Sequence, residues 1–170
     1  MKWDYEFDVV VVGSGNGALT SAICSHDGGA KTLVIEKSNQ YGGTSATSGG
    51  GVWIPNNRYA KAENVDDSDQ DARDYINSVS PEGMIKDELI ETYISEGPKM
   101  IDYLHENSQV KYRNLSHYPD YFPDNPGGKE GNRSMEPEPI NGTILGTDLG
   151  KLREQHPQTA FTMGPINMNF

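Results

Sequence analysis

A short apolar run, Val9–Val12, leads directly into a glycine-rich turn of the form G-x-G-x-x-A at residues 13–18. In such a turn Gly13 permits the tight bend, Gly15 lets the backbone approach a pyrophosphate, and Ala18 lets the following helix pack closely on the strand. The N-terminus of that helix offers N–H groups and the positive end of its dipole to phosphate oxygens. This order predicts a dinucleotide-binding strand–turn–helix unit rather than an ordinary glycine-rich turn.

An acidic residue, Glu36, ends the next apolar run. It lies 23 residues after Gly13, close to the roughly 20 at which a carboxylate holds a ribose 2′-hydroxyl. Its charge would repel a 2′-phosphate, which argues against an NADP-type ligand. The expected elements are a strand at Phe7–Val12, a helix at Gly15–His26 closed by Gly28 and Gly29, and a parallel strand at Lys31–Glu36 reached by a right-handed crossover.

The remainder of the chain is less regular. Acidic residues 66–71 suit a helix start, and Ala72, Tyr75, Ile76 and Val79 follow at helical spacing. A second helical segment is expected at Asp87–Asn107, with Pro98 starting a new helix or kinking this one, and a further helix could begin at Asp148–Arg153. The pattern predicts three consecutive segments, 1–60, 61–110 and 111–170. The fold class is α/β: a Rossmann-like βαβ unit with a parallel sheet, followed by helices and glycine- and proline-rich loops, as an incomplete domain.

Composition excludes several classes of function. A net charge of −11 leaves no basic stripe for nucleic acid. No apolar run approaches the roughly 18 residues that cross a bilayer, and the N-terminus lacks an apolar signal core, so we expect no transmembrane segment and a cytoplasmic location. The single cysteine, Cys24, gives neither a disulfide framework nor a cysteine metal cluster; we expect it buried against the sheet, and we expect no metal site.

A second glycine-rich stretch, residues 41–55, follows the acid almost at once. Its small residues can lay backbone N–H groups and hydroxyls along a pyrophosphate and a flat ring. The alternative is a flexible surface loop, but its end, Val52–Pro55, is too apolar for a solvated tip.

Together, these motifs resemble the FAD-binding segment of the fumarate reductase/succinate dehydrogenase flavoprotein superfamily, and within it the 3-ketosteroid Δ1-dehydrogenases. The resemblance covers the G-x-G-x-x-A turn, the Glu-Lys pair, the Gly-Gly-Thr-Ser motif and the Ser-Gly loop that ends in Trp and Pro. No histidine follows the ribose acid in residues 38–41, so the resemblance implies noncovalent FAD. The implied FAD-binding residues are Gly13, Ser14, Gly15, Gly17, Ala18, Glu36, Lys37, Gly42, Gly43, Thr44, Ser45, Ser48, Gly49 and Gly50.

A third cluster, Tyr118–Gly128, precedes a Gly-Asn-Arg-Ser sequence. The family has a similar aromatic-Pro-Asp-Tyr segment whose tyrosine lies beside the steroid A ring. This implies Tyr121 as a catalytic residue, and Tyr118 and Tyr121 as substrate-binding residues. Phenols offer apolar walls and hydrogen-bonding tips, which suit an apolar ketone. The alternative is a proline-broken surface loop whose tyrosines pack on the domain.

The resemblance implies 1,2-desaturation of a 3-ketosteroid, with a proton passing to a base, a hydride to the flavin N5, and electrons to an external acceptor that the sequence does not identify. The family's remaining catalytic groups come from later sequence, so the chain reads as an N-terminal fragment that ends within an element at Met163–Phe170. A non-catalytic dinucleotide-binding remnant, a Δ4 desaturase and a fumarate reductase-like enzyme stay open. Scattered arginines disfavour a dicarboxylate substrate: Arg58, Arg73, Arg113, Arg133 and Arg153.

Overall fold

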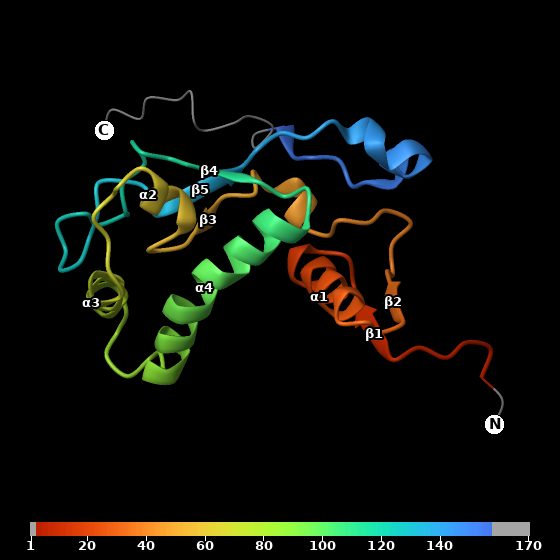
Figure 1. Cartoon of the computed structure of the whole chain (residues 1–170), viewed down its shortest axis with the longest axis horizontal. Coiled ribbons are helices and arrows are strands. Elements are labelled where there is room, and N and C mark those ends of the chain that lie inside the picture. The colour runs from red at the N-terminus through yellow and green to blue at the C-terminus, as the bar shows by residue number, and fades with distance from the viewer. Residues whose placement is uncertain (1–2, 158–170) are drawn as a thin grey trace. The chain divides into compact units, whose positions relative to one another are not determined.

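The computed structural model describes residues 3–157, so the expected end of the chain at Met163–Phe170 lies outside the described residues. Within that range the chain forms two compact units, which are described separately (Figure 1). The first unit holds residues 3–50 and 141–157, and the second holds residues 51–140. These units differ from the three consecutive segments expected from the sequence, because residues 141–157 return to pack with the N-terminal part of the chain.

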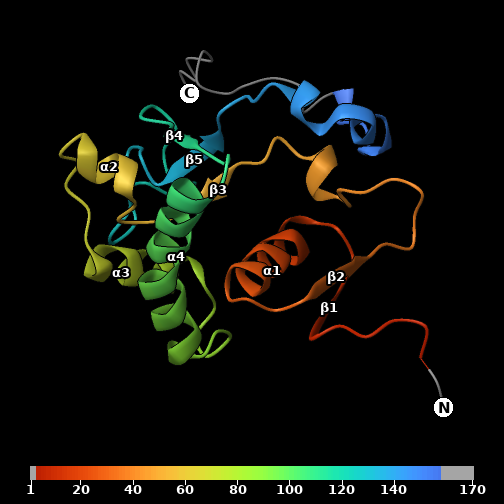
Figure 2. The ribbon, with the colours of Figure 1, turned by 45° about the vertical axis from the view of Figure 1, so that its right-hand side comes forward.

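The first unit is built on the predicted strand–helix–strand motif. Strands β1 (Val9–Val12) and β2 (Thr32–Ile35) pair in parallel, with Val9 opposite Thr32 and Val12 opposite Ile35. Helix α1 (Asn16–Asp27) joins them and packs on both strands (Figure 2). Gly29, at φ +87°, closes the helix with its N–H donating to the His26 carbonyl (2.9 Å). The α/β class and the parallel sheet are confirmed.

The face of this sheet away from buried Val11 is open. Val10 is 51% exposed and Val12 is 78% exposed, because successive side chains of a strand point to opposite faces. The prediction of a buried Cys24 was wrong, since this cysteine is exposed. A sheet of two short strands is too narrow to cover the width of α1, and no side chain of the helix is fully buried.

The segment that follows β2 turns through a short 3-10 helix, η1 (Ser45–Thr47). Tyr41 forms a parallel bridge with Leu152: the Tyr41 N–H donates to the Lys151 carbonyl, and the Arg153 N–H donates to the Tyr41 carbonyl, both at 2.9 Å. The expectation that a helix begins at Asp148 was wrong: a 3-10 helix, η2 (Gly142–Lys151), begins before this residue and ends soon after it, and its backbone breaks at Gly146 (φ 55°). This bridge explains why residues 141–157 belong to the first unit.

The second unit contains a small antiparallel sheet and three helices. Its strand order is β3 (Val52–Trp53), β5 (Ser134–Pro137), β4 (Tyr112–Asn114). Helix α2 (Arg58–Ala62) packs on β4 and on α4 (Asp87–Asn107), and α3 (Asp69–Val79) packs on α4. The sequence analysis had not predicted α2 or any of these strands.

The two longer helices of this unit start where their sequences predict. The Ser68 side chain caps α3, its Oγ accepting a hydrogen bond from the Asp71 N–H (3.0 Å). Pro98 does not start a new helix, because α4 continues through it to Asn107. Proline removes one backbone hydrogen bond there, and buried Ile94 and Ile101 hold the helix in place on either side. No helix among residues 3–157 is long and apolar enough to span a membrane.

The core of this unit lies between α4 and the sheet, around Ile54, Ile101, Tyr112 and Met135. Ile54 is 3% exposed, which confirms that the apolar stretch Val52–Pro55 is not a solvated tip. This packing fixes β3, and β3 carries Trp53 into the site described below.

Candidate functional site

The phosphate turn of the first unit leaves its helix N-terminus accessible to an anion. Gly13 adopts φ +97°, a conformation that side chains other than glycine rarely take, and its N–H donates to the Ile35 carbonyl (2.7 Å). Gly15 is the N-cap of α1, with no side-chain cap and no acidic residue in the first turn. Gly17 and Ala18 lie in that first turn. The N-terminal dipole is therefore not neutralised by the helix's own acids.

Ser14 and Glu36 meet because β1 and β2 are parallel and end at the same edge. The buried Ser14 hydroxyl donates to Glu36 Oε2 and accepts from the Gly42 N–H (2.9 Å). Glu36 Oε1 accepts from the Ser38 N–H (3.0 Å). The Ser14 hydrogen bond, followed by that of Ser38, lowers the pKa of Glu36 below its ordinary value. Glu36 is thus an ionised, oriented acceptor, and Ser14 fixes its orientation.

The Gly-Gly-Thr-Ser motif packs directly on the phosphate turn. Gly42 (φ +106°) and Gly43 (φ +56°) turn the chain, and a Cβ on Gly43 would come within 3.4 Å of the Gly15 Cα. Ser45 Oγ accepts from the Asn16 N–H (3.0 Å), so this hydroxyl occupies one donor of the helix N-terminus. The structure therefore brings residues 13–16, Glu36, Gly42, Gly43 and Ser45 together.

The other predicted cofactor residues lie at the margins of this cluster. Lys37 is exposed, and so is Thr44. Ser48, Gly49 and Gly50 follow η1, where the Gly50 N–H donates to Ser48 Oγ (3.1 Å). Of these residues, Lys37 joins the network of Ser14 and Glu36 through a backbone hydrogen bond to the Glu36 carboxylate, which helps to lower the pKa of Glu36.

The donor set of the first unit fits an adenine dinucleotide. The turn presents backbone N–H groups without side chains in the way: Cβ atoms built on Gly13 and Gly17 would meet nothing within 4 Å. Glu36 supplies a carboxylate at the end of the second strand, where a ribose is held in such units. The pyrophosphate would lie over Gly13–Ala18 and the ribose on Glu36. Among residues 3–157 no cluster of histidine, cysteine or acidic residues suited to a metal ion is found.

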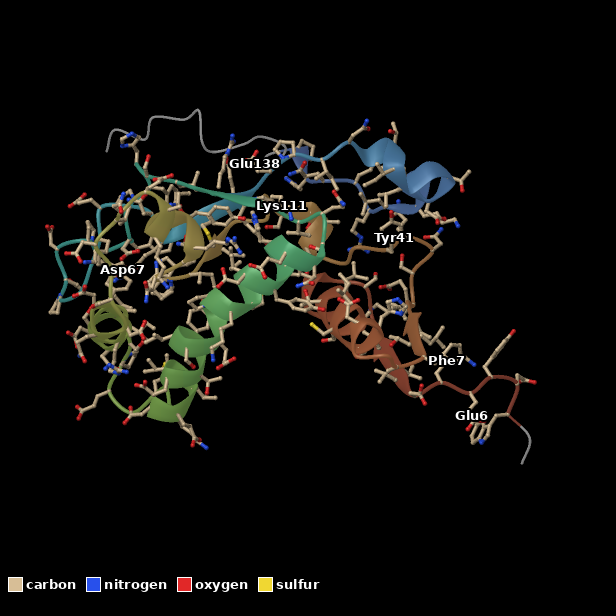
Figure 3. All side chains as sticks on the ribbon, viewed as in Figure 1. Glu6, Phe7, Tyr41, Asp67, Lys111 and Glu138 are labelled. Carbon is tan, nitrogen blue, oxygen red and sulfur yellow. The ribbon has the colours of Figure 1, made fainter. Side chains whose placement is uncertain are left out.

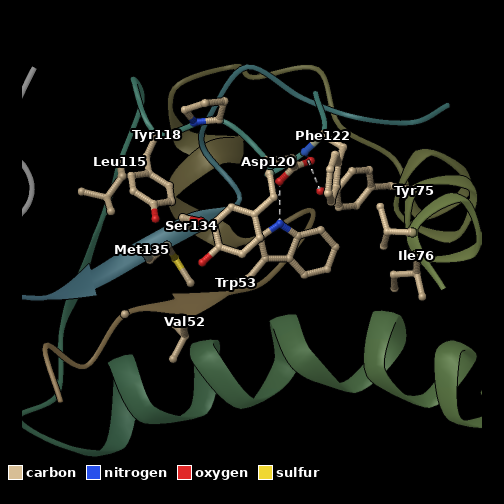
Figure 4. Close-up of a pocket in the computed structure, with 14 residues that line it drawn as sticks. Val52, Trp53, Tyr75, Ile76, Leu115, Tyr118, Asp120, Phe122, Ser134 and Met135 are labelled. Carbon is tan, nitrogen blue, oxygen red and sulfur yellow. Dashed lines mark hydrogen bonds between the residues drawn. The ribbon is translucent and has the colours of Figure 1, made fainter. Parts of the chain in front are cut away.

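The second unit contains a largely apolar pocket of about 560 Å³ (Figure 4). Its walls come from β3, α3, β5 and the loop that follows β4. Both tyrosines singled out in the sequence, Tyr118 and Tyr121, line it. The other lining residues are Gly51, Val52, Trp53, Tyr75, Ile76, Val79, Leu115, Pro119, Asp120, Phe122, Ser134 and Met135.

Tyr118 and Tyr121 differ in their surroundings. Tyr121 is 83% exposed, whereas Tyr118 is half-buried. Burial raises the pKa of Tyr118, and the charge of Tyr121 and a hydrogen bond to it raise that pKa further. Both phenols lie at the pocket, and Tyr121 is close enough to affect the titration of Tyr118.

Trp53 forms an aromatic wall of the pocket. Its ring stacks on Tyr93 (6.2 Å between centroids, 16° between planes) and lies 5.9 Å from the ring of Tyr75. Its indole N–H donates to Asp120 Oδ1 (2.6 Å), as Figure 4 shows. The indole is thus held by ring contacts with two tyrosines and by the hydrogen bond at its N–H.

A buried cation, Arg133, lies behind this wall and was missed as a site residue in the sequence analysis. Its side chain binds Asp120 and also Asp67. Asp67, which is labelled in Figure 3, precedes α3. The guanidinium carbon lies 5.4 Å from the centre of the Trp53 ring. The arginine of the Gly-Asn-Arg-Ser sequence was visible in the chain, but its partners lie too far away in sequence to be paired with it by inspection.

Comparison with known proteins agrees with this geometry. A family model described as "FAD binding domain" matches residues 8–167. The chain belongs to this FAD-binding domain family. FAD, the cofactor expected from the sequence, is confirmed, and it suits the donor set of the first unit.

The similar proteins include dehydrogenases of cyclic ketones. The chain is 40% identical over 163 residues to a Mycobacterium tuberculosis 3-oxosteroid 1-dehydrogenase, covering 96% of this chain and 28% of that protein. It is 38% identical over 157 residues to a Sinomonas cyclohexanicum 4-oxocyclohexanecarboxylate 2-dehydrogenase, covering 92% of this chain and 27% of that protein.

One solved structure is similar in both sequence and fold: a 3-ketosteroid delta1-dehydrogenase from Sterolibacterium denitrificans in complex with 1,4-androstadiene-3,17-dione. It gives a TM-score of 0.85 at 40% identity, over 93% of this chain and 28% of that one. The resemblance to the 3-ketosteroid Δ1-dehydrogenases is therefore confirmed, and the chain spans about 28% of the length of such relatives.

Proposed function

We propose that the protein carrying this chain is an FAD-dependent dehydrogenase that introduces the 1,2 double bond into a 3-ketosteroid. The observation that carries this proposal is the apolar pocket with two adjoining phenols, Tyr118 and Tyr121, in a chain of the FAD-binding family. Its volume of about 560 Å³ falls in the range of small-molecule sites, which is about 300–1,000 Å³.

The cofactor is held without a covalent bond in this proposal. Residues 38–41, which follow the ribose acid, contain no histidine that could attach to a flavin. The residues that hold FAD are the backbone of the Gly13–Ala18 turn, the Glu36 carboxylate and the small residues of the 42–50 loop. When bound, FAD supplies the acceptor for the hydride that leaves the steroid.

The phenols handle the proton that the reaction releases. Removing a proton from the carbon next to the ketone leaves charge on the ketone oxygen, and a base must take that proton. An unperturbed phenol has a pKa near about 10, so a tyrosine acting as base needs a neighbour that shares its proton. Tyr118 is such a neighbour, because burial raises its pKa and it can share its own proton with the phenolate form of Tyr121. Tyr121, as the phenolate, takes the proton from the substrate and becomes a neutral phenol. Because Tyr121 is exposed, it then releases this proton to water.

The lining of the pocket favours an uncharged ring ketone over a carboxylated one. No lysine, arginine or histidine is among the described residues that line it. Arg133 is paired with two carboxylates, Asp120 and Asp67, so the three groups together carry a net negative charge beside the pocket and would repel an anionic substrate such as 4-oxocyclohexanecarboxylate. We therefore propose a neutral steroid as substrate. A cytoplasmic location is also part of the proposal, supported by the single, unpaired cysteine.

Steady-state turnover by the full-length gene product tests the proposal. 4-Androstene-3,17-dione is supplied with FAD and an artificial electron acceptor, and the 1,4-diene is measured by chromatography. Tyr121→Phe keeps the ring and removes the hydroxyl, so we expect FAD binding to survive and turnover to fall by roughly 10²–10⁴-fold, the scale of general acid–base catalysis. Turnover of 4-oxocyclohexanecarboxylate in preference to the steroid would contradict the substrate. Turnover by Tyr121→Phe at the rate of the unsubstituted protein would contradict the role of this residue.

A further inference from the structure

The exposed phenol of Tyr121 stands on a backbone that is tied down on both sides. Before it, the buried Asp120 pairs with Lys129 across the loop: the Asp120 N–H donates to the Lys129 carbonyl (2.9 Å), and the Lys129 N–H donates to Asp120 Oδ2 (3.1 Å). After it, the Phe122 N–H donates to the Tyr75 hydroxyl (3.3 Å). The direction in which Tyr121 points is therefore set by the anchoring of its neighbours.

Asp120 is in turn held by Arg133, whose side chain is 2% exposed. Arg133 Nη1 donates to Asp120 Oδ2 (2.9 Å), while Asp120 Oδ1 accepts from the Trp53 indole (2.6 Å). The opposite edge of the guanidinium binds Asp67, through Nη2 to Oδ1 (2.7 Å) and through Nε to both oxygens (3.1 and 3.2 Å). One arginine thus joins the segment before α3, the pocket wall at β3 and the tyrosine loop.

The charges make this arginine hard to replace. Arg133 is one cation between two buried carboxylates, and burying a charge is costly unless it is paired and hydrogen-bonded. A guanidinium presents a rigid planar fork that can serve both carboxylates at once, whereas a lysine ammonium is a single point charge on a flexible stem. A lysine at this position can keep a positive charge near one carboxylate but cannot keep the geometry of both.

We propose that Arg133 is a positioning residue for Tyr121, acting through the Asp120 carboxylate, in the dehydrogenation proposed above, on which this inference rests. Arg133 does not touch the substrate. It fixes the backbone from which the catalytic phenol projects and, through the same carboxylate, the indole of Trp53 in the pocket wall. A misplacement of about 1 Å in a catalytic group can cost roughly 10²-fold in rate, so loosening this anchor lowers turnover more than steroid binding.

The test is a double-mutant cycle in the FAD-loaded full-length gene product, with Arg133→Lys, Tyr121→Phe and the double variant. The readouts are kcat and KM for 4-androstene-3,17-dione and, separately, the steroid affinity of the enzyme measured by the change in its flavin spectrum. The control is Arg73→Lys, because Arg73 makes a bidentate pair with Glu91 that is exposed and lies outside the pocket. We expect Arg133→Lys to lower kcat about tenfold or more with a smaller change in KM and steroid affinity, and Arg73→Lys to change neither.

The decisive comparison is the effect of Arg133→Lys in the Tyr121→Phe background. If Arg133 acts by placing the Tyr121 hydroxyl, the substitution has little further effect on kcat once that hydroxyl is gone. An equal loss in both backgrounds would show a merely structural role and overturn the inference. A loss no larger than that of Arg73→Lys would overturn it as well. Should Arg133→Lys fail to fold, Asp120→Asn replaces it in the same cycle, since it keeps the size of the side chain and removes the charge that binds Arg133.

Failure of the inference differs from failure of the proposed function. In the first case the unsubstituted enzyme makes the 1,4-diene and Tyr121→Phe is slow, but Arg133→Lys adds its own independent loss. In the second case the unsubstituted protein makes no diene, or Tyr121→Phe turns over at an unchanged rate. Either result refutes the proposed role of Tyr121 and, with it, that of Arg133.

Discussion

Gly127 and Gly83 provide a matched pair for testing the packing of the tyrosine loop. Both have a left-handed backbone, with φ +72° at Gly127 and φ +71° at Gly83. A Cβ at Gly83 would meet nothing within 4 Å, but a Cβ at Gly127 would lie 2.0 Å from the Asp71 carbonyl oxygen and 2.9 Å from the Tyr75 backbone nitrogen. The two substitutions to alanine therefore share their conformational strain and differ in the clash with α3.

The expected magnitudes follow from this difference. Alanine in the left-handed region costs about 1–2 kcal/mol, partly offset by about 0.4–1 kcal/mol from the reduced freedom of the unfolded chain. Gly83→Ala should therefore destabilise by about 1 kcal/mol or less. Gly127→Ala adds a backbone clash, which must move the loop or α3, and such overpacking costs a further 1–3 kcal/mol or so. At roughly 2–4 °C per kcal/mol for a chain of this size, the melting temperature of Gly127→Ala should lie several degrees below that of Gly83→Ala.

Thermal unfolding followed by circular dichroism measures this difference, and steroid binding by each variant gives a second readout. We expect Gly127→Ala to weaken steroid binding because Gly127 carries the loop of Tyr121 past the start of α3, whereas Gly83→Ala should leave binding intact. Equal melting temperatures for the two variants would show that the loop does not pack on α3 as described, and would refute the reasoning.

Two further predictions concern the cofactor and the pH dependence of stability. Glu36→Ala removes the ribose acceptor and should weaken FAD binding roughly ten- to a hundredfold, which corresponds to the free energy of one charge-assisted hydrogen bond. Equilibrium titration measures this affinity, and the control, Glu82→Ala at an exposed position, should leave it unchanged. Equal FAD affinities for the two variants would argue against the ribose assignment. His105 Nδ1 faces the Tyr59 hydroxyl (2.9 Å), and burial, followed by neighbouring positive charges, lowers its pKa in the folded state. A lowered pKa favours the neutral imidazole on folding, so this stabilisation is present above the unfolded pKa of about 6.5 and is lost as the pH falls through the folded pKa. Chemical unfolding should show a loss of stability from about pH 7 to 5 that His105→Gln diminishes and exposed His117→Gln does not; an unchanged pH profile in His105→Gln would contradict this.

The first unit was predictable because its signals are local in the sequence. The glycine spacing, the apolar runs and the acid at residue 36 together specify strand, turn, helix and strand, because the residues that determine each element lie within that element. The sequence did not predict the contacts between those elements. That the Ser14 hydroxyl joins Glu36 to the Gly42 backbone follows from the parallel pairing of β1 and β2, which sequence spacing alone does not describe. Cys24 was misplaced for a related reason, because its burial depends on the width of the sheet.

The second unit was less predictable because its contacts span long stretches of chain. Strands β4 and β5 are three and four residues long and mostly polar, so they give no alternating pattern to detect. Arg133 and Asp67 are 66 residues apart, and Trp53 and Asp120 are 67 apart. The aromatic-Pro-Asp-Tyr cluster pointed to the tyrosines, but the buried ion pairs that hold them depend on the tertiary fold.

The most direct test of the central claim is a single-turnover reaction without an external acceptor. The FAD-loaded full-length gene product is mixed anaerobically with 4-androstene-3,17-dione, the flavin spectrum is recorded, and the steroid is then analysed by chromatography. We predict that the flavin is reduced and that 1,4-androstadiene-3,17-dione forms in an amount equal to the flavin reduced. A protein that carries FAD at full occupancy, yet leaves both flavin and steroid unchanged, would contradict the account.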